Sequence, residues 1–219
     1  MEEQWEDHKW IFQPNGMLLD IYVQEVNLAV WMELIDFLNS NYQLQYGFLS
    51  ENETGDTIDK AYINKVFTDE TGELDRKSVA IMLDSVQVNC YFFLQDEIEF
   101  DADPKEFKGQ EQFKTIIDFM TAISGSLKRE VIMTAEGAAN YPLITINKEN
   151  KLLKFTRQSE LKQMYDKDFT LFRRIKGFYI YSLMRLLMLL RNSKMKEWLV
   201  SYITDLTGAT KIHTATKKR

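Results

Sequence analysis

The chain has little of the chemistry on which metal sites and covalent mechanisms depend. Its 219 residues include one cysteine, Cys90, and two histidines, His8 and His213. A single cysteine excludes an internal disulfide, and so small a set of cysteine and histidine excludes a structural zinc site. The N-terminus is acidic where a secretory signal would carry positive charge and an apolar run, so we expect a cytoplasmic protein.

Glycine-rich motifs and long apolar runs are also missing. The nine glycines form neither Gly-x-Gly-x-x-Gly nor a Gly-x-x-x-x-Gly-Lys-Ser/Thr loop, so no phosphate-binding loop is indicated. The most apolar stretch, residues 178–190, contains Ser182 and Arg185, and it is shorter than the roughly 20 residues that a membrane-spanning helix needs. Cys90 lies in a strand-like apolar run, which is typical of a core position. We therefore predict no catalytic, cofactor-binding or metal-binding residues and no transmembrane segment.

What the chain has in abundance is charge, and the charge reverses along its length. Residues 1–100 hold 20 acidic and 5 basic residues, residues 101–150 hold 8 and 6, and residues 151–219 hold 5 and 16. The three net charges are −15, −2 and +11. Such asymmetry usually reports on partners or on docking within the chain, and not on the fold.

Hydrophobic periodicity predicts an α+β domain over residues 1–157, in which a mostly antiparallel sheet carries two helices on one face. A hairpin or a strand opening is expected over residues 10–23, around Pro14 and Gly16, and Asn27 is expected to cap the first helix. Residues 62–68 fit a strand, although residues 57–67 also fit a short helix. The other expected strands cover residues 44–49, 78–84, 86–94, 97–103, 130–134, 143–147 and 152–156, and the two helices cover residues 28–42 and 113–127.

The pattern is helical throughout residues 158–208, which form a basic segment expected to pack on the sheet domain. The expected helices cover residues 159–165, 169–191 and 194–206. Residues 209–219 are mostly polar, so a flexible tail is expected there.

The sharpest local signal is the strand over residues 97–103, where acidic and apolar residues alternate. The period of two places Glu97, Glu99, Asp101 and Asp103 on one side at intervals of about 6.8 Å, with the apolar residues toward the core. Carboxylates in a row repel one another unless a positively charged group neutralises them. Three explanations remain open: a solvated sheet face or a charge-protected edge, neutralisation by the chain's own basic segment, or a basic external partner.

The basic segment allows more than one function. Arg173, Arg174 and Lys176 lie next to aromatic residues in the sequence, a mixture that is typical of nucleic-acid-binding surfaces. The helix over residues 178–190 is apolar almost all round, which favours burial against the sheet domain or a homodimer partner. Arg174 and Arg185 are candidates for pairing within the chain, and docking on a membrane surface is a further alternative.

These patterns favour a non-enzymatic binding protein of the immunity-protein or inhibitor type. Its acidic surface, formed by Glu97, Glu99, Asp101 and Asp103, would bind a basic protein such as a nuclease toxin. The alternative is a nucleic-acid-binding regulator that acts through Arg173, Arg174, Lys176 and Arg185.

A metal-dependent nuclease is a further alternative. It would use the acidic strand together with an acidic-x-Lys triplet, as at Glu106 to Lys108 or Glu149 to Lys151.

Overall fold

The computed structural model describes residues 3–47, 55–149 and 151–168. The chain divides into two units, Met1–Leu161 and Lys162–Arg219, and the sheet belongs to the first. The helices expected over residues 169–191 and 194–206 and the tail over 209–219 lie outside the described residues. So do the four basic residues singled out above and the proposed dimer helix over residues 178–190.

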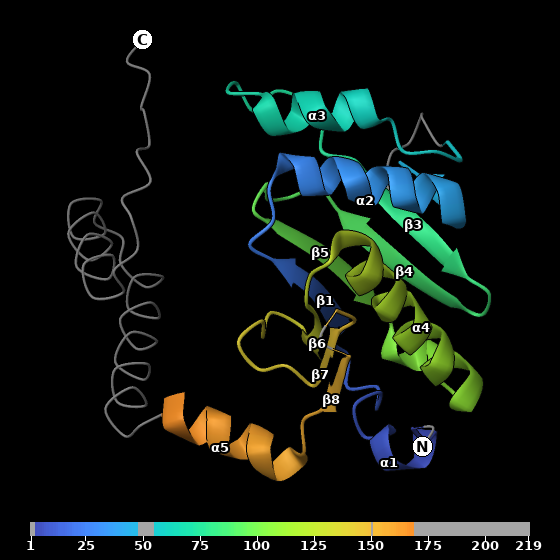
Figure 1. Ribbon diagram of the computed structural model, residues 1–219, viewed down its shortest axis with the longest axis vertical. Coiled ribbons are helices and arrows are strands. Elements are labelled where there is room, and N and C mark those ends of the chain that lie inside the picture. Colours follow the sequence, from blue (N-terminus) through green and yellow to red (C-terminus); the bar gives the residue numbers. More distant parts are fainter. Residues whose placement is uncertain (1–2, 48–54, 150, 169–219) are drawn as a thin grey trace, which may run out of the picture. The chain divides into compact units, whose positions relative to one another are not determined.

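Within the described part of the chain, eight strands form one sheet in the order β2-β3-β4-β5-β1-β6-β7-β8. Every neighbouring pair is antiparallel, as predicted. Figure 1 shows the sheet with helices α2 and α4 crossing it. The strands are β1 (Leu19–Gln24), β2 (Gln43–Tyr46), β3 (Ser78–Leu83), β4 (Val86–Tyr91), β5 (Glu97–Ala102), β6 (Val131–Ala135), β7 (Ile144–Asn147) and β8 (Leu152–Phe155).

Two helical crossovers place β1 and β5 side by side at the centre of the sheet. Helix α2 (Leu28–Asn41) leads the chain from β1 to the edge strand β2, and helix α4 (Gln110–Leu127) leads it from β5 to β6. Strand β1 pairs with β5 on one side and with β6 on the other. Both partners of β1 are therefore distant from it in the sequence. The remaining helices are α1 (Trp5–His8), α3 (Lys60–Thr68), the 3-10 turn η1 (Pro104–Glu106) and α5 (Gln158–Asp168).

Local chemistry explains where the two long helices begin and end. The Asn27 side chain accepts a hydrogen bond from the amide of Val30 at 3.1 Å, which is the predicted cap of α2. Helix α4 ends at Lys128, whose φ of 52° is left-handed. In the last turn of α4, the Ser124 hydroxyl donates to the carbonyl oxygen of Arg129 at 2.6 Å and accepts from the amide of Lys148 at 3.0 Å. Ser124 thereby ties the helix to the β7–β8 hairpin.

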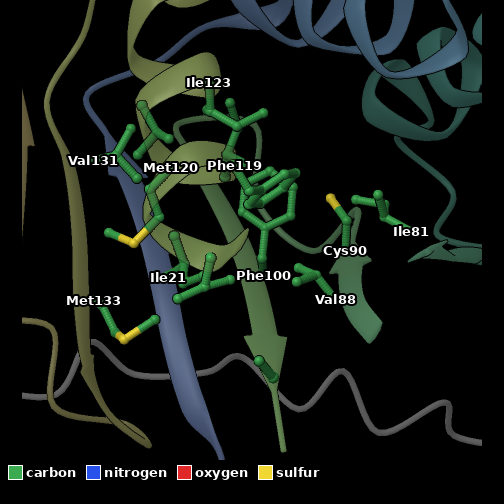
Figure 2. Packing of buried hydrophobic residues seen from close by; sticks show 14 of the residues in the cluster. Ile21, Ile81, Val88, Cys90, Phe100, Phe119, Met120, Ile123, Val131 and Met133 are labelled. Carbon is green, nitrogen blue, oxygen red and sulfur yellow. The ribbon is translucent and has the colours of Figure 1, made fainter. Parts of the chain in front are cut away.

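The core lies between one face of the sheet and the helices α2 and α4. Phe100 on β5 meets Phe119 on α4 edge-on, with ring centroids 5.6 Å apart, and Figure 2 shows the aliphatic side chains around this contact. Cys90 is fully buried in the same cluster. The predicted inward direction of the apolar residues of β5 is confirmed, since Ile98, Phe100 and Ala102 are all fully buried.

Two local predictions need correction. The hairpin over residues 10–23 is wrong in its first arm: only β1 is a strand, and the chain before it forms α1 and a turn. Phe12 instead joins an aromatic cluster, with its ring centroid 4.6 Å from that of Phe107, and burial of this ring outweighs strand propensity.

The strand over residues 62–68 is wrong as well, and the alternative helix is present as α3. Asp59 caps it, and Ile63 and Val66 are its buried residues. By contrast, α5 confirms the short helix expected over residues 159–165. No helix among the described residues is long and apolar enough to cross a membrane.

Candidate functional site: a carboxylate patch on the polar sheet face

The face of the sheet opposite the helices is polar along its central strands. Side chains alternate between the two faces of a strand, so the residues between the core positions of β1, β4 and β5 share this second face. They are Asp20, Tyr22 and Gln24 on β1, Gln87, Asn89 and Tyr91 on β4, and Glu97, Glu99 and Asp101 on β5.

Strand register brings four carboxylates together on this face. Asp20 is the cross-strand partner of Asp101, Tyr22 of Glu99 and Gln24 of Glu97. Directly paired residues have Cβ atoms about 4.5–5.5 Å apart. We call Asp20, Glu97, Glu99 and Asp101 the carboxylate patch.

Two members of the patch are buried and held by neutral donors. Asp20 is 4% exposed and Asp101 is 6% exposed. Asp20 accepts hydrogen bonds from the Tyr22 hydroxyl and from the amide of Gly137, both at 2.7 Å. Asp101 accepts one from the Asn89 side-chain amide at 2.8 Å and another from the Tyr91 hydroxyl. The two carboxylates are therefore fixed in position.

The other two members, Glu97 and Glu99, are half-buried. Gln24 donates to Glu97 at 3.3 Å. These two glutamates form the accessible part of the patch.

Burial and mutual repulsion perturb the acidities of the patch. Burial raises the pKa of the Glu99 carboxyl, and the neighbouring carboxylates raise it further. Burial likewise raises the pKa of Asp101, against the opposing effect of its two hydrogen-bond donors. Burial and the same negative charges raise the pKa of the Tyr22 and Tyr91 hydroxyls. Burial is the largest cause of each shift, and the neighbouring negative charges act in the same direction.

Among the described residues, no lysine or arginine forms an ion pair with any member of the patch. The ion pairs that are present lie elsewhere, such as Lys114 with Asp118 on α4 and Lys9 with Glu6 on α1. In the described part of the chain, the patch therefore retains its negative charge without a counterion from the protein.

The predicted row of four acids is correct for three of them. Glu97, Glu99 and Asp101 share one face, but Asp103 lies beyond the end of β5 and caps the turn η1. Its side chain accepts from the amide of Lys105 at 2.9 Å and pairs with the Lys105 ammonium at 3.6 Å. The proposal of a charge-protected edge is wrong too, because β5 lies between β4 and β1 in the interior of the sheet.

Asp20 is the member that sequence reasoning missed. The alternation of residues 19–24 could have assigned it to the same face as Tyr22 and Gln24. The sequence could not show that Asp20 lies beside Asp101, because the pairing joins strands about 80 positions apart in the sequence.

Other candidate chemistry does not gather at the patch. In the described part of the chain, no group of three or more histidine, cysteine, aspartate or glutamate side chains is arranged to hold a metal ion. Of the two acidic-x-Lys triplets, the first has its carboxylate engaged, since Glu106 accepts from the amide of Gln87 at 2.7 Å. The second, Glu149 to Lys151, includes residue 150, which lies outside the described residues.

Cys90 and His8, the cysteine and the histidine of the described residues, lie in packed positions. Burial raises the pKa of the Cys90 thiol well above its ordinary value, so the thiolate is disfavoured. His8 stacks on Phe155 with ring centroids 3.8 Å apart and contacts Glu3 at 2.9 Å.

Comparison with known proteins gives little further guidance. No family model matches the chain, and no curated protein matches it. Among solved structures, the chain is similar to one from the complex of the toxic C-terminal tip of CdiA from Pseudomonas aeruginosa with immune protein, solved at 1.75 Å. The sequences are 10% identical, the TM-score is 0.38, and the similarity covers 59% of this chain and 94% of that chain. A TM-score at this level does not establish a shared fold.

Proposed function

We propose that this chain is a non-enzymatic binding protein whose carboxylate patch docks a basic protein, in the manner of an immunity protein that blocks a nuclease toxin. The observation that carries the proposal is the concentration of four carboxylates on one sheet face, two of them buried and two half-buried, with no cation paired to them in the described part of the chain. A basic partner would supply the missing positive charge and would be steered to the face by long-range attraction.

The energetic cost of the patch supports a role in binding. A buried charge without an ionic partner destabilises the folded state, and the raised pKa of Asp101 indicates that its charged form is disfavoured. Local arrangements that work against stability are expected at functional sites. The side chains of Asn89 and Tyr91 fix Asp101, and that of Tyr22 fixes Asp20, so the buried half of the patch would need little ordering on binding.

The nucleic-acid-binding alternative depends on Arg173, Arg174, Lys176 and Arg185, which lie outside the described residues. The described sheet face is acidic and would repel a phosphate backbone. The basic protein partner is therefore the proposal that the described geometry favours.

Affinity capture with charge variants tests the proposal. The immobilised full-length chain is exposed to extract from its host at low salt, beside a variant carrying Glu97→Gln and Glu99→Gln. Both glutamates are half-buried on the patch, so the double substitution removes two charges with little change of shape. We expect a basic protein that the natural chain retains and the variant loses.

A matched control separates the patch from overall charge. Glu33 on α2 and Glu111 on α4 are exposed on the helical side of the sheet, so Glu33→Gln with Glu111→Gln removes the same charge elsewhere. This control is expected to retain the partner. Equal loss in both double variants, or capture of no basic protein by the natural chain, would overturn the proposal. The retained protein, if an enzyme, is then assayed for stoichiometric inhibition by the chain.

A further inference from the structure

An aromatic pair, one ring half-buried and the other exposed, borders the carboxylate patch. The rings of Tyr91 and Phe93 stack with centroids 5.0 Å apart and planes 5° from parallel. Tyr91 is the cross-strand partner of Glu99, and its hydroxyl bonds to Asp101. We call Tyr91 and Phe93 the aromatic ledge. A planar apolar surface thus adjoins the carboxylates directly.

The aromatic ledge is open to solvent and rests on a fixed backbone. Phe93 is 45% exposed and the next residue, Leu94, is 52% exposed. The Phe93 carbonyl accepts from the Arg76 guanidinium at 2.5 Å, and the Leu94 carbonyl accepts from the indole of the fully buried Trp31 at 3.1 Å. Large exposed apolar side chains held this firmly are typical of the energetic centre of an interface.

From this juxtaposition we propose that the carboxylate patch and the aromatic ledge together form a receptor for an arginine side chain of the partner. The guanidinium would lie on the face of the Phe93 ring that Tyr91 leaves uncovered and would direct its N–H groups to a glutamate of the carboxylate patch. Arginine fits better than lysine because its planar group stacks on aromatic faces and pairs with a carboxylate through two parallel hydrogen bonds. This inference rests on the proposed function and specifies the chemistry of the partner's contact.

Labelled peptides test the receptor without knowledge of the partner. Octa-arginine and octa-lysine carry the same charge, and their affinities for the full-length chain are measured by fluorescence anisotropy at low salt. We expect the arginine peptide to bind more tightly. The substitution Phe93→Ala should weaken the arginine peptide by about 2- to 5-fold, the range of an exposed cation–π contact, and should change lysine binding less. Phe93→Tyr, which keeps the ring, should preserve arginine binding.

Two controls distinguish failure of the receptor from failure of the proposed function. Leu153 on β8 is 42% exposed and is separated from β4 by four strands, so Leu153→Ala should alter neither peptide. Glu99→Gln should weaken both peptides, because it removes charge. If Glu99→Gln weakens both while Phe93→Ala acts no differently from Leu153→Ala, the aromatic receptor is refuted and the acidic docking surface stands. If neither peptide binds the natural chain, both proposals fail.

Discussion

Replacing Asp101 by asparagine should stabilise this protein, although the substitution alters a buried, hydrogen-bonded residue. The amide oxygen of asparagine can still accept from Asn89 and Tyr91, the two donors that Asp101 uses. The new side chain would also supply an amide N–H that can donate to the carboxylate of the cross-strand partner, Asp20. One repulsive pair thereby becomes an attractive one.

The size of the effect follows from ordinary hydrogen-bond energies. A net hydrogen bond to a charged group contributes roughly 1.5–3 kcal/mol, and imperfect geometry reduces it. We therefore expect Asp101→Asn to raise the free energy of unfolding by about 1–2 kcal/mol at pH 8. For a chain of this size each kcal/mol corresponds to roughly 2–4 °C in Tm. The measurement is urea denaturation followed by circular dichroism.

The pH dependence supplies an independent check. The pKa of Asp101 is raised in the folded state, so the folded protein binds its proton more readily than the unfolded chain does. The natural protein then gains stability from this residue as the pH falls through the raised pKa, and loses it as the pH rises. The advantage of Asp101→Asn should therefore be largest at pH 8 and should shrink toward acidic pH. A variant less stable than the natural protein at pH 8, or an advantage that does not change with pH, would refute the reasoning.

Three further predictions concern the scaffold that holds the patch. Ser124→Ala leaves the Arg129 carbonyl and the Lys148 amide without their partner, so unfolding should become easier by about 1–3 kcal/mol; Ser124→Thr tests whether the hydroxyl alone suffices. Asn27→Ala removes the cap of α2 and should cost about 1 kcal/mol, whereas Asn27→Ser should recover most of it. The Cys90 thiol is fully buried and should react with a maleimide only after denaturation. Rapid labelling of the native protein would contradict its position in the core.

Much of the fold was predictable because it depends on local periodicity. The helices α2 and α4 follow the 3.6-residue apolar repeat, and β5 follows the alternation of two, so their faces were correctly assigned. The first arm of the expected hairpin was wrong because the burial of Phe12 against Phe107 depends on contacts between residues far apart in the sequence. Helix α3 was given only as an alternative to a strand because its short apolar run fits both periods.

The candidate site was only half predictable for the same reason. Alternation alone aligned Glu97, Glu99 and Asp101, but Asp20 joins them through strand pairing. The aromatic ledge also depends on register, since Tyr91 faces Glu99 across β4 and β5. Asp103 continued the sequence pattern, yet Pro104 ends the strand and turns that side chain into a cap.

The most direct test of the central claim is the association rate between the full-length chain and its captured partner, measured by stopped-flow at about 20 mM and about 200 mM salt. Between these two salt concentrations the electrostatic screening length falls from roughly 20 Å to roughly 7 Å. The rate should fall steeply with salt for the natural chain and for the Glu33→Gln, Glu111→Gln control. It should be at least severalfold lower, with a shallower salt dependence, for the Glu97→Gln, Glu99→Gln variant. Identical rates for the two double variants would contradict the assignment of the carboxylate patch as the docking surface.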